Sequence, residues 1–243
     1  MTSSLNKKVI IIGASSGIGK ELAILYLQAG CRVGITGRSA ALLDELKNKF
    51  PHQAEMAVFD ITGNDNIVHL EPLVQKLGGL DLFIYNAGYG EVSEMPDWQI
   101  DKRTILTNVY GFAETVDYAY NYFVQQGYGQ IAATSSIASL AGNHFAPAYS
   151  ASKAFMSNYM EGLYLKAKKI KQRITITDIQ PGFVKTKMAK GPGRFWEAPA
   201  AKAARQIMGA IEAKKFRVYI TRRWWLIAQL IKIMPGWLYR RIG

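Results

Sequence analysis

The chain has 243 residues, of which 49% are hydrophobic and 20% are charged. This composition excludes general disorder, and the length fits one three-layer α/β domain better than two domains. The net charge of +12 is uneven, because residues 1–162 hold 11 basic and 15 acidic side chains whereas residues 163–243 hold 19 and 3. The basic last third suits anionic lipid, nucleic acid or an acidic carrier as a partner, or is simply a solvated face.

The N-terminal segment, residues 1–8, is short and polar and lacks the apolar core and cleavage site of an export signal. We therefore expect a cytoplasmic protein. Cys31 is the only cysteine, so it forms no disulfide within the chain, and we expect it to be buried as a small apolar residue. The three histidines are scattered along the chain, so we expect no metal site.

Short apolar runs rich in β-branched residues alternate along the chain with segments of helical periodicity. The runs are residues 9–12, 33–36, 56–59, 82–85, 131–134, 174–179 and 218–220. This alternation predicts a Rossmann-like, doubly wound parallel sheet of about seven strands with helices on both faces. We expect one domain over residues 1–221, followed by a basic, aromatic extension over residues 222–243. In such sheets a ligand lies outside the carboxyl ends of the strands, where the strand order reverses.

A glycine-rich turn follows the first predicted strand and opens an amphipathic helix. Its glycines allow a tight turn and close approach to a pyrophosphate, whose charge is favoured by the free amides at the helix N-terminus. In this context the turn predicts a dinucleotide site. The residues expected to contact the cofactor here are Gly13, Ser15, Ser16, Gly17, Ile18 and Gly19.

The second predicted strand ends in Gly37 and Arg38, where an NAD site would place an acidic residue for the ribose hydroxyls. A 2′-phosphate is therefore not repelled here, and Arg38 can hold it with charge-assisted hydrogen bonds. NADPH is accordingly the predicted cofactor, and NADH is less favoured. The alternative is that Arg38 is a solvated surface residue.

Tyr149 and Lys153 are four residues apart in a predicted helix over residues 149–168, so they share one helical face. A nearby ammonium favours the phenolate and lowers the tyrosine pKa from its usual value of about 10. The pair is thus expected to donate and accept protons near neutral pH.

Further motifs follow in a fixed order: Tyr85-Asn86-Ala87-Gly88, Asn108 in Thr-Asn-Val-Tyr-Gly, Ser136, and Pro181-Gly182-x-Val184-x-Thr186. With the GxxxGxG turn and Tyr-x-x-x-Lys, they make residues 6–220 resemble the single-domain branch of the short-chain dehydrogenase/reductase family. One departure is Ile12, where the family usually has threonine, which removes one side-chain hydrogen bond.

The resemblance implies hydride transfer between the nicotinamide of NADPH and a carbonyl or secondary alcohol carbon. It implies that Tyr149 exchanges the proton, Ser136 holds the substrate oxygen, Lys153 also holds the nicotinamide ribose, and Asn108 anchors a water of the proton relay. Ser135 is the near competitor of Ser136. The further cofactor contacts that it implies are Asp60, Asn86, Ala87, Gly88, Pro181, Gly182, Val184 and Thr186. Asp60 could instead cap the next helix.

The substrate is a small carbonyl or alcohol compound whose identity the sequence leaves open. Residues 187–199 contain Gly-Pro-Gly followed by Phe195 and Trp196, which favours a mobile cover over an apolar ligand. We interpret His144 as an exposed loop residue rather than a catalytic one. The alternative function is a non-catalytic NADP-binding sensor or interaction protein, although sensors of this fold typically lose the tyrosine and lysine. No stretch resembles a nucleic-acid module, so we expect no nucleic-acid partner.

The apolar run at residues 224–234 has 11 residues, against about 20 needed to span a bilayer. Tryptophans and a tyrosine beside arginines are typical of a segment that lies in a membrane interface. We therefore predict that residues 222–241 contact an anionic membrane, which would place the protein peripherally on its inner face. The alternative is that this segment packs on the domain or on a second subunit. The family resemblance implies a homodimer or homotetramer.

Overall fold

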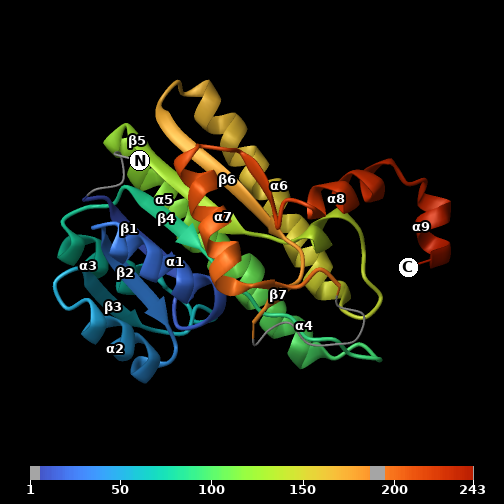
Figure 1. Ribbon diagram of the computed structural model, residues 1–243, viewed down its shortest axis with the longest axis horizontal. Coiled ribbons are helices and arrows are strands. Elements are labelled where there is room, and N and C mark those ends of the chain that lie inside the picture. The colour runs from blue at the N-terminus through green and yellow to red at the C-terminus, as the bar shows by residue number, and fades with distance from the viewer. Residues whose placement is uncertain (1–5, 187–194, 243) are drawn as a thin grey trace.

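The computed structural model describes residues 6–186 and 195–242. Within these residues a seven-stranded sheet is covered by helices on both faces (Figure 1). The strand order is β3-β2-β1-β4-β5-β6-β9, and all neighbouring strands run parallel. The strands are β1 (Lys8–Ile12), β2 (Arg32–Gly37), β3 (Ala54–Val58), β4 (Leu82–Tyr85), β5 (Tyr128–Thr134), β6 (Arg173–Pro181) and β9 (Arg217–Ile220). The predicted Rossmann-like fold is confirmed, with strand ends that differ from the predicted ones by at most three residues.

The helices connect successive strands and then continue beyond the sheet. They are α1 (Gly17–Gln28), α2 (Ala40–Lys49), α3 (Ile67–Leu77), α4 (Trp98–Ile105), α5 (Gly111–Gln126), α6 (Pro147–Lys169), α7 (Ala200–Glu212), α8 (Trp224–Ile233) and α9 (Gly236–Ile242). A two-stranded parallel pair, β7 (Val184–Lys185) with β8 (Ala198–Pro199), lies beside the main sheet. No helix of residues 6–186 and 195–242 is long and apolar enough to cross a membrane.

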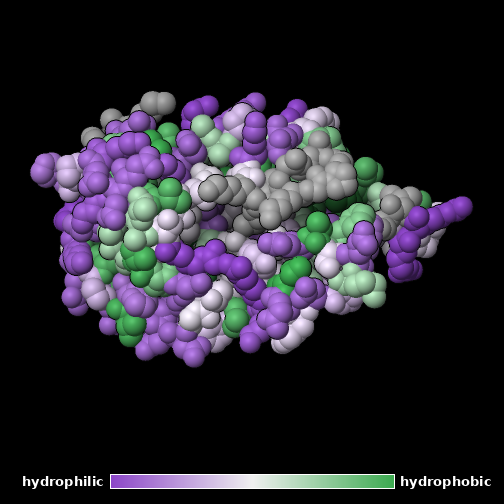
Figure 2. All heavy atoms as spheres, turned by 90° about the horizontal axis from the view of Figure 1, so that it is seen from below, coloured by the Kyte–Doolittle hydropathy of each residue, from purple (hydrophilic) through white to green (hydrophobic). Residues whose placement is uncertain are grey.

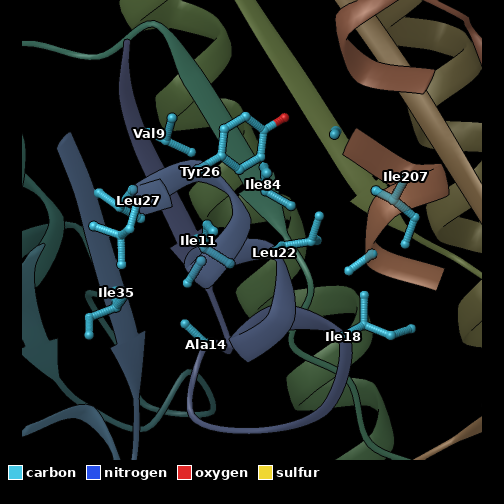
Figure 3. Packing of buried hydrophobic residues seen from close by; sticks show 14 of the residues in the cluster. Val9, Ile11, Ala14, Ile18, Leu22, Tyr26, Leu27, Ile35, Ile84 and Ile207 are labelled. Carbon is cyan, nitrogen blue, oxygen red and sulfur yellow. The ribbon is translucent and has the colours of Figure 1, made fainter. Parts of the chain in front are cut away.

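The period of two along each strand divides the apolar side chains between two cores. Val9 and Ile11 of β1 face α1, α2 and α7, and this core also contains Leu22 and Ile207 (Figure 3). The residue between them, Ile10, belongs to the second core, which α3, α5 and α6 complete. Because both faces are covered, the strands are continuous apolar runs, as the sequence shows. Cys31 is fully buried in the first core, as predicted.

The strand order reverses between β1 and β4, so the helices that follow these two strands, α1 and α5, cover opposite faces of the sheet, and a ligand crevice is expected at this point. The turn after β1 is held on both sides by backbone hydrogen bonds. Ala14 donates to the Thr36 carbonyl at 2.8 Å, and Asn86 donates to the Ile12 carbonyl at 2.9 Å. The second bond anchors Ile12 through its backbone, although its side chain cannot make the threonine hydrogen bond.

Candidate active site

A cleft of about 710 Å³ opens at the carboxyl ends of β1, β2, β4, β5 and β6. The predicted cofactor and catalytic residues converge on it from segments as far apart in the sequence as Gly13 and Thr186. Its lining includes Gly13, Ser15, Ser16, Gly17, Ile18, Arg38, Asp60, Asn86, Ala87, Gly88, Ser136, Tyr149, Lys153, Pro181, Gly182, Val184 and Thr186. Gly19 and Asn108 are buried beneath this lining.

The glycine turn after β1 packs directly against the turn after β4. Gly13 has φ +83°, and a Cβ at this position would lie 2.8 Å from the Ala87 backbone nitrogen. A Cβ on Gly19 would collide with the Gly13 carbonyl oxygen and the Asn86 side-chain amide. Since no side chain intervenes, the first amides of α1 remain beside the cleft, where they can bind a phosphate. The turn therefore fits a dinucleotide pyrophosphate.

Arg38 and Asp60 face each other at the end of the cleft beside β2 and β3, with the guanidinium nitrogen 3.5 Å from the carboxylate oxygen. Asp60 also accepts hydrogen bonds from the Thr62 amide and hydroxyl, at 3.0 and 2.9 Å. Partial burial raises the pKa of Asp60, but these hydrogen bonds and the charge of Arg38 outweigh it and hold the pKa below its usual value. Helix α3 begins after Asn66, so Asp60 caps a local turn and not that helix.

Ser136, Tyr149 and Lys153 meet at the other end of the cleft. Ser136 follows β5, and its hydroxyl accepts a hydrogen bond from the Ala138 amide at 3.1 Å. The Tyr149 ring packs against Gly90, where a Cβ would collide with it. The Lys153 ammonium donates to the Thr134 carbonyl at 2.9 Å and lies 5.7 Å from the centre of the Tyr149 ring. The helical spacing and the end of β5 thus bring all three side chains together.

The expected lowering of the tyrosine pKa is wrong for this structure. Burial raises the pKa of Tyr149, and its hydrogen bond with Ser136 offsets only part of that effect. Lys153 is itself 3% exposed, and burial lowers its pKa to about 7 despite the opposing charge of Asp178. The physical reason is desolvation, which disfavours both the phenolate and the ammonium and here outweighs their mutual attraction.

Asn108 lies in a π-helical turn (Leu106–Tyr110) between α4 and α5, and its side chain is fully buried. Its amide accepts from the Tyr89 amide at 2.9 Å, and donates to the Tyr89 carbonyl at 2.7 Å and to the Ser152 hydroxyl at 2.9 Å. The wider turn aims this side chain at the loop after β4. Asn108 therefore ties that loop to α6, the helix that carries Tyr149 and Lys153.

The sequence profile of the short chain dehydrogenase family matches residues 7–194. The chain belongs to this family. It is 34% identical over 189 residues to an uncharacterized oxidoreductase of Myxococcus xanthus, which covers 75% of this chain and 74% of the relative. It is 28% identical to an uncharacterized oxidoreductase of Mycobacterium tuberculosis over 100% of both chains. As a family member, the chain is an NAD(P)-dependent dehydrogenase or reductase.

Solved structures share the fold at lower identity. A short chain dehydrogenase/reductase from Burkholderia phymatum in complex with NAD superposes with a TM-score of 0.85 at 18% identity, over 95% of this chain and 94% of that chain. A 3-ketoacyl-(acyl-carrier-protein) reductase from Brucella melitensis complexed with NADH gives 0.80 at 20% identity, over 90% and 99%.

Ser135, the near competitor of Ser136, has its hydroxyl bonded inside the sheet. Its hydroxyl donates to the buried Asp178 carboxylate at 2.5 Å and to the Ile179 carbonyl at 3.0 Å. Strand alternation separates the two serines, so Ser135 points into the sheet and Ser136 remains beside Tyr149. Sequence reasoning did not identify Asp178, because a carboxylate inside a strand shows its partners only in three dimensions.

The C-terminal helices contribute two residues to the cleft that sequence reasoning also missed, Ile231 of α8 and Tyr239 of α9. The sequence analysis considered only the overall composition of residues 222–241. The helical periodicity of α8 could have distinguished a face that packs on the domain from a face exposed to solvent. Of the predicted cover at residues 187–199, positions 187–194 lie outside the described residues. Phe195 and Trp196 pack on Trp224 of α8, with ring centres 5.1 and 6.1 Å away.

The buried ammonium predicts a distinctive pH dependence of stability. Lys153 has a folded pKa of about 7, against about 10.4 in the unfolded chain. Between these values the unfolded state binds the additional proton, so this group penalises folding fully below pH 7 and progressively less as the pH rises. Relative to Lys153→Met, the free energy of unfolding of the unchanged protein should therefore rise by up to about 1.4 kcal/mol for each pH unit above 7.

Urea unfolding of both proteins between pH 7 and 10 measures this difference. Lys166→Met, which changes an exposed lysine of the same helix, is the control and should give a constant difference. A constant difference for Lys153→Met as well would show that Lys153 is not desolvated in the folded protein.

Proposed function

We propose that this protein is an NADPH-dependent oxidoreductase that interconverts a carbonyl and a secondary alcohol of an apolar substrate. The observation that carries the proposal is the meeting of Ser136, Tyr149 and Lys153 at one end of a cleft whose other end is a glycine turn. The reacting carbon would lie at the end with the serine and tyrosine, and the adenosine at the end with Arg38.

The cleft fits a nicotinamide dinucleotide because the glycine turn packs closely, with no room for a side chain at Gly13 or Gly19, and leaves the first amides of α1 beside the cleft. Structural relatives bound to NAD and NADH support this assignment. The α1 amides would hold the pyrophosphate, and Pro181, Gly182, Val184 and Thr186 would contact the nicotinamide end. Bound in this position, the cofactor supplies or accepts the hydride.

The raised pKa of Tyr149 keeps its hydroxyl protonated at neutral pH, which suits a proton donor in carbonyl reduction. The Tyr149 proton goes to the developing alkoxide, and the Ser136 hydroxyl stabilises the same oxygen by a hydrogen bond. Lys153, with a pKa of about 7, can hold or release a proton near neutral pH and so return one to the tyrosine. These assignments would also serve alcohol oxidation in reverse.

NADPH preference rests on Gly37 and Arg38. A Cβ at Gly37 would lie 3.2 Å from the Ser15 hydroxyl oxygen, so the close fit of the two turns disfavours an acidic side chain there. Arg38 is 55% exposed in its side chain, and its ion pair with Asp60 is long at 3.5 Å. Such a pair is weak, so a phosphate dianion can take over the guanidinium.

A non-catalytic NADP sensor is the second candidate. Retention of the serine, tyrosine and lysine together at the cleft disfavours it, because a sensor needs none of them.

The outer face of the C-terminal helices supports peripheral contact with an anionic membrane. Five large apolar side chains are 51–77% exposed there: Trp225, Leu226, Leu230, Ile233 and Trp237. The same segment carries five exposed cations and no acidic residue: Arg222, Arg223, Lys232, Arg240 and Arg241. Figure 1 shows α8 and α9 projecting from the body of the molecule, and Figure 2 shows both hydrophilic and apolar residues at this end.

A two-fold dimer through this face would place like charges against each other, since the same patch meets its own copy. We therefore assign this face to a lipid surface, which the protein would approach from the cytoplasmic side, and place any homodimer or homotetramer contact elsewhere.

Cofactor preference should depend on Arg38. Arg38→Ala should weaken NADPH binding roughly tenfold to a hundredfold and leave NADH binding nearly unchanged, because one charge-assisted contact contributes about 1.5–3 kcal/mol. Both affinities can be measured by calorimetric titration. Arg32→Ala, at the opposite end of β2, is the control. Equal affinity of the unchanged protein for the two cofactors would contradict the preference.

Turnover should depend on the Tyr149 hydroxyl. Tyr149→Phe should retain the melting temperature and NADPH affinity but lose about two to four orders of magnitude in kcat, the usual contribution of a positioned acid. A screen of carbonyl compounds followed by NADPH absorbance provides the assay. Tyr159→Phe, on the same helix as Tyr149, is the control. It removes a hydroxyl that donates to Asp117 of α5, and the variant should keep its activity. Substantial turnover by Tyr149→Phe would remove the tyrosine from the mechanism.

Membrane contact should depend on the outer face of α8. The protein should co-sediment with phosphatidylglycerol vesicles at low salt, less at high salt, and poorly after Leu230→Glu. Leu165→Glu on α6 is the matched control, because these leucines are 51% and 55% exposed. Equal binding by the two variants, or none by the unchanged protein, would refute this assignment.

A further inference from the structure

The active-site cleft has one wall that comes from outside the sheet domain. Ile231 of α8 and Tyr239 of α9 line the same cleft as Ser136 and Tyr149. These helices follow the last strand of the sheet, and Figure 1 shows them extending away from the sheet at the right of the molecule. The inner face of the C-terminal segment is therefore turned toward the reacting end of the site, opposite to the exposed face described above.

The first turn of α8 is fixed to the floor of the cleft by Trp224, which is 3% exposed. Its indole lies over Gly182, where a Cβ would collide with the ring. The Phe183 ring packs edge-on against it, with 5.5 Å between ring centres. One turn further along, Ala228 is fully buried. Because Trp224 and Ala228 are four residues apart, they hold one face of α8 down and set the rotation of the helix.

The far end of the segment is fixed by a hydrogen bond from the Tyr239 hydroxyl to the Gly142 carbonyl, at 2.5 Å. Gly142 belongs to the loop between Ser136 and α6, which also lends Ala141, Asn143 and Ala146 to the cleft. The segment thus closes on this loop and leaves Ile231 and Tyr239 between the two fixed points.

The two sides of the cleft differ in chemistry. The side bounded by α8, α9 and the segments after β5 and β6 is mostly apolar, with Asn143 as a polar member: Ile137, Ala138, Ala141, Phe183, Ile231 and Tyr239. The opposite side has charged residues: Glu91 comes from the loop after β4, and Arg103 comes from α4. The Arg103 guanidinium lies 4.5 Å from the centre of the Tyr89 ring. An apolar group attached to the reacting carbonyl would bind more favourably on the C-terminal side, because there it would desolvate fewer polar side chains of the protein.

We propose that the C-terminal helices form the tail-binding wall of the active site, in which Ile231 and Tyr239 select carbonyl compounds with a long alkyl tail. The hydrogen bond from Tyr239 to Gly142 keeps this wall in place. The inference rests on the proposed oxidoreductase function and adds the residues that determine substrate specificity. It requires no membrane, since the tail lies on the inner face.

The test uses a graded alkyl series on the full chain: butan-2-one, hexan-2-one, octan-2-one and decan-2-one for turnover, and the matching secondary alcohols for binding. Alcohol binding is measured by calorimetry with NADPH present, because oxidation of an alcohol needs the oxidised cofactor. For the unchanged protein, affinity and kcat/KM should rise with length by up to about fourfold per methylene, which corresponds to about 0.8 kcal/mol for each buried CH₂.

Ile231→Trp should fill the tail position, so decan-2-ol affinity and decan-2-one kcat/KM should fall at least about tenfold, and by more than the same quantities for the four-carbon compounds. Leu226→Trp is the matched control, since it adds an indole to the outer face of the same helix and should keep the length dependence. Tyr239→Phe retains the ring but removes the hydrogen bond, so it should reduce the length dependence more than it reduces turnover of butan-2-one.

The possible outcomes distinguish a failure of the tail-binding wall from a failure of the proposed oxidoreductase function. A flat length dependence in the unchanged protein, or equal profiles for Ile231→Trp and Leu226→Trp, would overturn the tail-binding wall even if turnover is observed. Unchanged length dependence in Tyr239→Phe would overturn the role of the hydrogen bond. Length-dependent alcohol binding that Ile231→Trp abolishes, without turnover of any carbonyl compound, would support the wall and reject the oxidoreductase function.

Discussion

The close approach of two backbone turns at the reversal of strand order is the constraint on which the cleft depends. Gly13 lies against Ala87, and Gly19 lies against Gly13, with no room for a Cβ at either glycine. This contact aligns the N-terminus of α1 with the loop after β4. The phosphate end and the reacting end of the cleft therefore have a fixed spacing, and α6 can place its tyrosine and lysine against the same crevice.

Burial controls the chemistry at the reacting end. In water an ammonium beside a phenol would lower the phenol pKa, but Tyr149 and Lys153 are both desolvated here. The protein thus favours a neutral tyrosine beside a lysine whose pKa is about 7. Asp178 lies in the sheet beneath them, where Ser135, Ser157, Gln180 and Arg217 bind its carboxylate. This network keeps a negative charge near Lys153 without exposing it to the cleft.

The C-terminal helices relate the site to the surface of the molecule. One face of α8 packs on Gly182 and Phe183, and the opposite face carries exposed leucine, isoleucine and tryptophan. The two interpretations of the segment, packing and surface contact, are compatible because they concern different faces of one amphipathic helix. Its inner face supplies cleft-lining residues from outside the sheet domain.

The sequence by itself determined the sheet, its parallel arrangement and the family, because strand and helix periods and motif order are local properties. It also predicted that Ser136, Tyr149 and Lys153 act together. Ser136 lies just after the end of β5, and Tyr149 and Lys153 are one helical turn apart on α6. Tertiary structure alone decided the pKa directions, because desolvation depends on every segment that covers a side chain. It likewise decided that Tyr239 reaches Gly142, a contact between residues 97 positions apart that no local pattern encodes.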